Sequence, residues 1–192
     1  MILTLTGASG AGKSTLARAL VRLLPSARLS PGCTTRPVRE TETQEDVRRL
    51  SEKEFAAMRE SGDFLWAVEV HGYWYGTLRR VVAAGLSDHE HWLLLVLTPS
   101  VLPILKRFAI QSGQGEAVRS VYVLAPEQAI LRRRLSEREV EAEVIDRRLV
   151  DCVTWDRTAR SSDLCDFFVP GEGDVDQHAW RLISQLPTRE VE

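Results

Sequence analysis

The chain has 192 residues, of which 44% are hydrophobic, and its 25 basic and 27 acidic side chains give a formal net charge of −2. This composition excludes an intrinsically disordered protein, and the near-neutral charge excludes binding of nucleic acid through bulk positive charge. One domain is expected at this length, and 22 of the basic residues are arginines, the side chain best suited to binding phosphate.

Apolar runs that are typical of buried strands recur along the chain. The expected strands are 2–6, 64–70, 92–97, 118–124 and 166–169. Helical patterns separate most of them, at 13–24, 51–62, 77–85, 101–108, 126–135, 142–160 and 174–186. Ser51 and Glu54 form a capping box, Thr77 is expected to cap the third helix, and Pro126 to begin the fifth.

The alternation of strands and helices predicts an α/β fold. Strands that are apolar throughout indicate a parallel sheet covered by helices on both faces, a three-layer α/β/α arrangement. The segment from about 31 to 85 interrupts the alternation, and we expect it to be a lobe inserted between core segments 1–30 and 86–192.

Cysteine use and hydropathy indicate a cytoplasmic protein. The three cysteines, Cys33, Cys152 and Cys165, include no CxxC pair, so neither a disulfide framework nor a zinc site is predicted. The longest apolar run, 92–97, is far shorter than the roughly 20 residues of a membrane-spanning helix. The N-terminus lacks the basic region of a signal peptide, and no membrane partner is expected.

A glycine-rich motif lies between the first strand and the first helix. The segment follows the pattern GxxxxGK[ST], and the residues expected to bind ATP phosphates are Gly7, Ala8, Ser9, Gly10, Ala11, Gly12, Lys13, Ser14 and Thr15. Glycines let successive backbone N–H groups turn toward phosphate oxygens, and the helix adds the positive end of its dipole. Lys13 is predicted to reach the β- and γ-phosphates, and Ser14 to bind Mg²⁺. A chance match is disfavoured because strand, loop and helix follow in the required order.

Three features favour a small-molecule kinase: the short chain, the inserted lobe and a late cluster of arginines. No GTPase-like switch motif is present, and no acidic residue ends the strand at 92–97. Arg132, Arg133, Arg134 and Arg147 are expected to lie on solvated helix faces, paired with the glutamates at 137, 139, 141 and 143.

Several further motifs resemble the guanylate kinase family. They are Thr34–Arg39, Leu50–Phe55, Glu69–Gly72, Tyr75–Thr77 and the late arginines Arg138 and Arg148, in the family's order and spacing over nearly the whole chain. The resemblance implies the P-loop NTPase fold, an acceptor-binding lobe, a short lid at about 135–143, and Mg-ATP as phosphoryl donor. It also implies that the partners are ATP and a small phosphorylated acceptor. No nucleic-acid partner is expected from the net charge, and the sequence leaves a monomer or homodimer open.

The resemblance assigns roles to several arginines, to Lys13 and to a tyrosine. Arg36, Arg39 and Tyr75 match positions that bind the acceptor phosphate, and Arg138 and Arg148 match lid arginines that act with Lys13 in catalysis. Phosphoryl transfer depends on positioning and on neutralising spread negative charge, which bidentate guanidinium groups do well.

The residues that contact guanine in the family are replaced here. Gly32, Trp66 and Leu97 stand in place of a serine, a glutamate and an aspartate, and Val47 in place of a tyrosine that binds phosphate. Glu69 does not compensate, because an odd offset along a strand places it on the face opposite Trp66. The nominal reaction is phosphorylation of GMP to GDP, and we expect the acceptor to bind without the family's guanine contacts.

Two alternatives remain open. Ribose 1,5-bisphosphate phosphokinases, which form phosphoribosyl diphosphate, share this fold and a stretch similar to Leu50–Phe55, and they also lack the guanine contacts. Guanylate-kinase-like modules that bind proteins without catalysis typically have damaged P-loops, whereas Lys13 and Ser14 are present here. The four histidines are predicted to have no acidic partner, so no general base is expected, which favours an acceptor that is already an anion.

Overall fold

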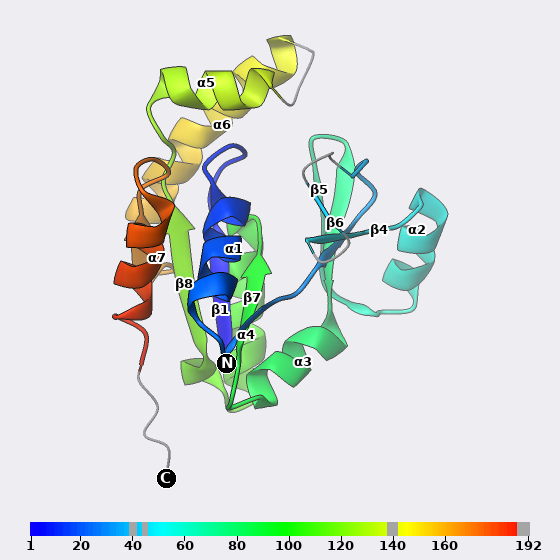
Figure 1. Cartoon of the computed structure of the whole chain (residues 1–192). Coiled ribbons are helices and arrows are strands. Elements are labelled where there is room, and N and C mark those ends of the chain that lie inside the picture. The colour runs from blue at the N-terminus through cyan, green and yellow to red at the C-terminus, as the bar shows by residue number, and fades with distance from the viewer. Residues whose placement is uncertain (39–41, 44–45, 138–141, 188–192) are drawn as a thin grey trace.

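The computed structural model describes residues 1–38, 42–43, 46–137 and 142–187 (Figure 1). At its centre is a sheet of five parallel strands in the order β2-β7-β1-β8-β9. Their bounds are Ile2–Thr6 for β1, Ala27–Leu29 for β2, Trp92–Val96 for β7, Val118–Val123 for β8 and Phe167–Val169 for β9. The predicted α/β class and its parallel sheet are confirmed.

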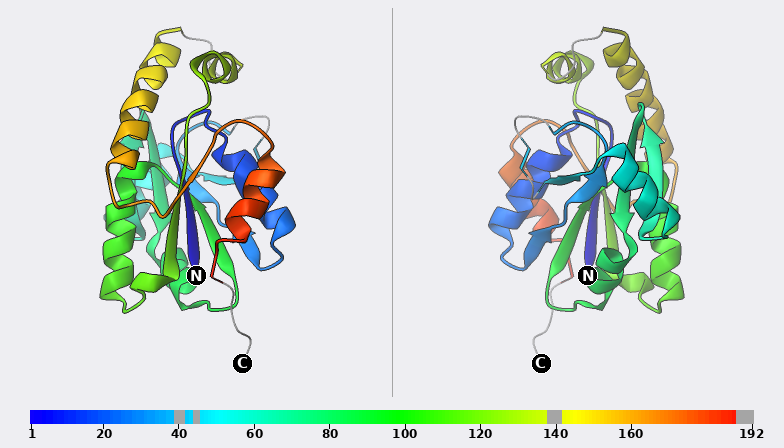
Figure 2. Two further views of the ribbon diagram at one scale, coloured as in Figure 1. Left: turned by 90° about the vertical axis from the view of Figure 1, so that its left-hand side faces the viewer. Right: turned by 90° about the vertical axis from the view of Figure 1, so that its right-hand side faces the viewer.

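Helices cover both faces of this sheet (Figure 2). On one face lie α1 (Lys13–Leu23) and α7 (Val175–Ile183), and on the other α3 (Arg79–Ser87), α4 (Leu102–Gln111) and α6 (Ala142–Arg160). Side chains of β1 alternate between the two layers, because successive residues of a strand point to opposite faces. Leu3 and Leu5 pack with α1 and α7, whereas Ile2 packs with α3 and α4.

A second sheet of four strands lies beside the core, in the order β4-β3-β6-β5. It consists of β3 (Gly32–Thr34), β4 (Val47–Arg49), β5 (Phe64–Val70) and β6 (Tyr73–Leu78), and helix α2 (Glu52–Glu60) covers it. Phe55 of α2 is buried and stacks on Phe64, with 4.5 Å between the ring centroids. The predicted capping box is confirmed: Ser51 accepts from the Glu54 backbone N–H, and the Glu54 carboxylate accepts from that of Ser51.

Two predicted helix starts are wrong. Thr77 is a residue of β6 and caps no helix; α3 begins at Arg79 after Leu78. Pro126 precedes α5 (Gln128–Ser136), whose N-cap is Glu127. The strands β2, β3 and β4 were not predicted, because a periodic pattern cannot be recognised in three residues, and β6 was missed because its end was assigned to the helix at 77–85. Two short 3₁₀ turns, Pro99–Val101 and Gly115–Ala117, complete the elements.

Helix α5 and the first turns of α6 lie beyond the P-loop end of the sheet (Figure 1). The opposite end of α6 is attached to the sheet through Asp156, which accepts hydrogen bonds from the Tyr122 hydroxyl at 2.9 Å and the Ala125 backbone N–H at 3.1 Å. Burial, together with this carboxylate, raises the pKa of Tyr122. Within the described ranges, no helix combines the length and the apolar character needed to cross a membrane.

Candidate active site

The P-loop has the backbone shape that its glycines predict. Gly7, Gly10 and Gly12 have φ values of 134°, 84° and 106°, a region that other residues rarely adopt. A Cβ atom on Gly7 would lie 2.3 Å from the Val123 carbonyl oxygen. No side chain caps α1 at Gly12, so its first N–H groups point into the loop. The loop is therefore suited to bind an anion at the start of α1.

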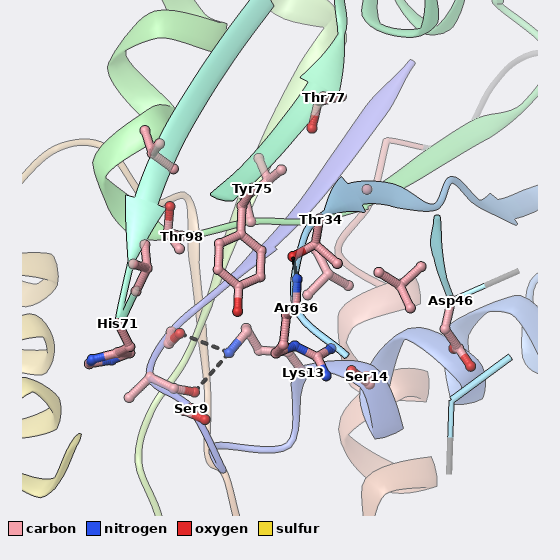
Figure 3. A pocket seen from close by; sticks show the side chains of 18 of the residues that line it. Ser9, Lys13, Ser14, Thr34, Arg36, Asp46, His71, Tyr75, Thr77 and Thr98 are labelled. Atoms are coloured by element: carbon pink, nitrogen blue, oxygen red, sulfur yellow. Dashed lines mark hydrogen bonds between the residues drawn. The ribbon is translucent and has the colours of Figure 1, made fainter. Parts of the chain in front are cut away.

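The amine of Lys13 lies inside this loop. Its Nζ donates hydrogen bonds to the carbonyl oxygens of Gly7 at 2.9 Å and Ala8 at 2.7 Å (Figure 3). In the same view the Tyr75 hydroxyl and the Arg36 side chain approach Lys13 from the second sheet. Residues far apart in the sequence thus direct polar groups into one space.

A single pocket contains most of the predicted site. It is lined by the P-loop residues Gly7 to Gly10 and Gly12 to Thr15, together with Arg36, Tyr75 and Arg148. Ala11 is fully buried and lines a different cavity. Arg39, Arg138 and the middle of the predicted lid, residues 138–141, lie outside the described residues.

Arg148 reaches the pocket from α6. It is 7% exposed, and its Nη1 donates to the Ser9 hydroxyl at 3.3 Å. Arg147, on the outer side of the same helix, is exposed. A buried guanidinium beside the P-loop can neutralise charge on a transferring phosphoryl group, which a solvated one cannot do as well.

Arg36 is fixed at both ends. Its backbone N–H donates to the Thr34 hydroxyl at 3.1 Å, and that hydroxyl donates to the Trp74 carbonyl at 2.8 Å. Its guanidinium donates through Nη2 to both carboxylate oxygens of Glu42, each at 2.8 Å, and through Nη1 to the Pro37 carbonyl at 2.6 Å. Arg36 and Glu42 both line the pocket.

All four residues that depart from the family pattern line this pocket: Gly32, Val47, Trp66 and Leu97. Trp66 is 6% exposed and packs with the core layer of α3 and α4. Glu69 is exposed and absent from the described pocket wall, although the β5–β6 pairing has an irregularity between Phe64 and Trp66. The four replacement residues therefore all line the pocket that contains the P-loop.

Each carboxylate in the described pocket wall contacts a basic side chain. Glu42 pairs with Arg36, and Asp46 accepts from Arg18 Nε at 3.2 Å and Nη2 at 2.9 Å. Burial would raise the pKa of Asp46, but hydrogen bonds from Arg18 and Thr43 outweigh it and lower the pKa. Asp46, which precedes β4, thereby connects the second sheet to α1.

The third carboxylate, Asp151, is the acidic partner of a histidine. His71, at the β5–β6 turn, lies with Nε2 3.5 Å from Oδ2 of Asp151 on α6, and both residues line the pocket. The expectation that no histidine has an acidic partner is therefore wrong. The backbone of His71 is in the left-handed region, with φ of 51°, because a two-residue turn formed by His71 and Gly72 requires it. In Figure 3 its ring is directed toward α6 and away from Lys13.

Arg134 is a site residue that the sequence analysis missed. We expected a solvated arginine, but its Nη1 donates to the carbonyl oxygens of Gly10 at 3.1 Å and Gly171 at 2.8 Å. By contrast, Arg132 pairs at the surface with Asp146, and Arg133 is exposed. Arg134 also lines a second cavity between the P-loop and the turn after β9. Arg134 directly precedes the buried Leu135 on α5, and nothing in the local sequence distinguishes it from its exposed neighbours, so only the fold shows its contacts.

These features define a class: a P-loop phosphotransferase of the small-molecule kinase type, with a parallel core and an adjoining sheet that completes the pocket. Comparison with known proteins agrees. The guanylate kinase family model matches residues 1–154. The chain belongs to the guanylate kinase family.

Individual relatives support this assignment. The chain is 32% identical to a guanylate kinase of Symbiobacterium thermophilum over 165 residues, which cover 85% of this chain and 75% of that protein. It is 36% identical to one of Alkalilimnicola ehrlichii over 148 residues, 76% and 70% of the two chains. The crystal structure of guanylate kinase from Anaplasma phagocytophilum superposes with a TM-score of 0.67 at 22% identity, over 97% of this chain and 84% of that one. A shikimate kinase from Acinetobacter baumannii shares the fold, with a TM-score of 0.51.

Proposed function

We propose that this protein transfers the γ-phosphoryl group of Mg-ATP to a phosphate oxygen of a small phosphorylated acceptor. The supporting observation is the convergence of Lys13, Arg148, Arg36 and Tyr75 on one pocket. The first two lie at the P-loop, and the other two reach in from the second sheet. Such a pocket has positive charge for two phosphorylated ligands, and the P-loop fixes which side takes the nucleotide.

In this reaction the chain acts by binding and positioning. The P-loop N–H groups and Lys13 hold the donor phosphates, and Arg148 neutralises charge that develops on the transferring group. Arg36 and Tyr75 hold the acceptor phosphate so that its oxygen faces the donor. The Ser14 hydroxyl, in the first turn of α1 and on the pocket wall, fits a Mg²⁺ ligand, and the ion would neutralise phosphate charge there. An anionic acceptor needs no base, so His71 has no assigned step.

The acceptor is nominally GMP, recognised without the family's guanine contacts. Guanine presents N–H donors that require acceptor atoms, and buried unpaired polar groups are costly. In the described wall the carboxylates Glu42, Asp46 and Asp151 all contact basic side chains, and the family's guanine-reading positions hold Gly32, Trp66 and Leu97. These facts favour weak selection for guanine and support ribose 1,5-bisphosphate as the second candidate acceptor.

The non-catalytic module is the least supported alternative. A protein-binding module has no use for the Lys13 contacts within the loop or for a buried Arg148 against Ser9. Both features are retained here together with the glycine conformations of the P-loop.

An acceptor panel tests the proposal. ADP release is measured with Mg-ATP and each of GMP, dGMP, AMP, UMP and ribose 1,5-bisphosphate, and the phosphorylated product is identified by mass spectrometry. We expect turnover with at least one acceptor and a GMP efficiency well below that of an ordinary guanylate kinase assayed in parallel. Equal GMP efficiency would refute our interpretation of Gly32, Trp66 and Leu97. No turnover with any acceptor and no ATP binding would favour the module.

A further inference from the structure

Arg36 makes contacts whose arrangement suggests a role for a neighbouring acid. Arg36 and Glu42 are both largely buried in the pocket wall, with side chains 11% and 12% exposed. A buried pair of opposite charges contributes little net stability, because desolvation offsets the attraction. A pair kept inside a ligand pocket therefore calls for an explanation other than stability.

The geometry supplies that explanation. Glu42 takes up one terminal nitrogen of the guanidinium, Nη2, with both of its oxygens at 2.8 Å. The Pro37 carbonyl takes a hydrogen of the other terminal nitrogen, Nη1. Because the guanidinium is planar, contacts at two nitrogens fix its plane, and the remaining N–H groups keep one orientation. Thr34 fixes the backbone of the same residue.

We propose that Glu42 is a positioning residue for the acceptor phosphate: it holds the Arg36 guanidinium in the orientation that binds that phosphate. This inference rests on the proposed function, because it takes Arg36 as a ligand of the acceptor. It adds a residue that touches neither phosphate and acts through Arg36.

Repulsion between Glu42 and the acceptor phosphate would change the acceptor affinity in the opposite direction from positioning, so the sign of the change distinguishes the two effects. The Glu42 carboxylate also repels an incoming phosphate and occupies donors that a phosphate could use. If this repulsion dominates, removal of Glu42 tightens acceptor binding. If positioning dominates, removal loosens it, because an untethered guanidinium loses rotamer freedom on binding and can turn toward other acceptors such as the Asp46 carboxylate.

The experiment compares Glu42→Gln, Glu42→Ala and the surface variant Glu60→Ala, which changes an exposed glutamate on α2 of the same lobe. Steady-state KM and kcat are measured for ATP and for the best acceptor of the panel. Binding of GMP and of ribose 1,5-bisphosphate is measured separately by calorimetry without ATP. We expect Glu42→Ala to raise the acceptor KM and Kd about tenfold, the loss of one charge-assisted contact, with the ATP KM unchanged.

Conservative replacement separates positioning from a general structural effect. Glu42→Gln keeps an oxygen that can accept from Arg36, so its acceptor KM should lie between those of wild type and Glu42→Ala. In an Arg36→Ala background, Glu42→Ala should add no further rise, because its effect passes through Arg36. Glu60→Ala should match wild type in all readouts.

An unchanged or lowered acceptor KM and Kd in Glu42→Ala would overturn the proposal, as would an equal rise in the Arg36→Ala background. A rise in ATP KM of the same size would show a general distortion of the pocket and would also overturn it. Binding without turnover in the wild type would count against the proposed function alone, since the calorimetric comparison still measures the effect of Glu42.

Discussion

Arg134 connects the P-loop to the turn after β9, and its removal should lower the stability of the fold and weaken ATP binding. Arg134→Ala deletes the hydrogen bonds to the Gly10 and Gly171 carbonyl oxygens, at 3.1 and 2.8 Å. Hydrogen bonds with a charged partner contribute about 1.5–3 kcal/mol each, and partial exposure of the side chain favours the lower end. We therefore expect the free energy of unfolding to fall by about 2–3 kcal/mol.

The same change should weaken ATP binding. If about 1.4 kcal/mol of the loss falls on the phosphate-binding conformation of Gly10 and its neighbours, the ATP KM rises roughly tenfold. The acceptor KM should change much less, because Arg134 lies outside the described wall of the acceptor pocket. Urea unfolding followed by far-UV circular dichroism gives the stability, and coupled ADP release gives both KM values.

Arg133→Ala is the matched control, since Arg133 precedes Arg134 on α5 and is exposed. We expect it to stay within about 0.5 kcal/mol of wild type, as surface substitutions usually do. If the two variants have the same stability and the same ATP KM, the contacts of Arg134 have no energetic role and our reasoning is wrong. Arg134→Lys keeps the charge without the planar fork and should fall between the two.

Three further predictions concern the P-loop, the turn after β9 and the stability of the fold at acid pH. Lys13→Ala should lower kcat at least about 100-fold while its far-UV circular dichroism spectrum stays that of a folded protein, whereas Lys53→Ala on α2 should leave kcat unchanged; comparable activity in the two variants would remove Lys13 from the mechanism. Gly171→Ala would place a Cβ atom 2.2 Å from the Leu124 carbonyl oxygen and 2.6 Å from that of Ala11, so we expect a loss of about 3 kcal/mol by urea unfolding. Because the pKa of Asp46 is lowered in the folded state, its ionised form stabilises the fold above the ordinary carboxyl pKa of about 3.9, and this stabilisation is lost as the pH falls through the lowered value. Asp46→Asn should thus be less stable than wild type at neutral pH, and the difference between the two unfolding midpoints should shrink as the pH falls below about 3.9; a constant difference would contradict this assignment.

The parts of the site that follow from local pattern were predicted from the sequence. The P-loop is one continuous segment in which every glycine has a local conformational reason, so strand, loop and helix could be assigned together. The capping box at Ser51 is equally local and was confirmed. The parallel sheet followed from runs of apolar residues, which only a covered sheet can bury.

Contacts between distant segments could not be predicted in this way. Arg134 meets Gly10 across 124 positions of sequence and Gly171 across 37, and no periodicity marks such a pair. His71 and Asp151 belong to a turn and a helix whose approach depends on the whole fold. Thr77 failed as a cap because β6 continues through it: pairing with Trp66 across the sheet overrides its local preference for a helix N-terminus.

The part of the pocket formed by the P-loop and the part formed by the second sheet therefore differ in how closely they follow the family pattern. The donor half retains every element of the P-loop, because transfer of a phosphoryl group constrains that geometry whatever the acceptor is. The other half contains Arg36 and Tyr75, which we propose bind the acceptor phosphate, and departs from the family pattern at Gly32, Val47, Trp66 and Leu97. Assays of ATP binding thus separate a kinase from a non-catalytic module but report on a half shared by all candidate kinase activities. Only competition among acceptors, measured as ratios of kcat/KM, discriminates between them.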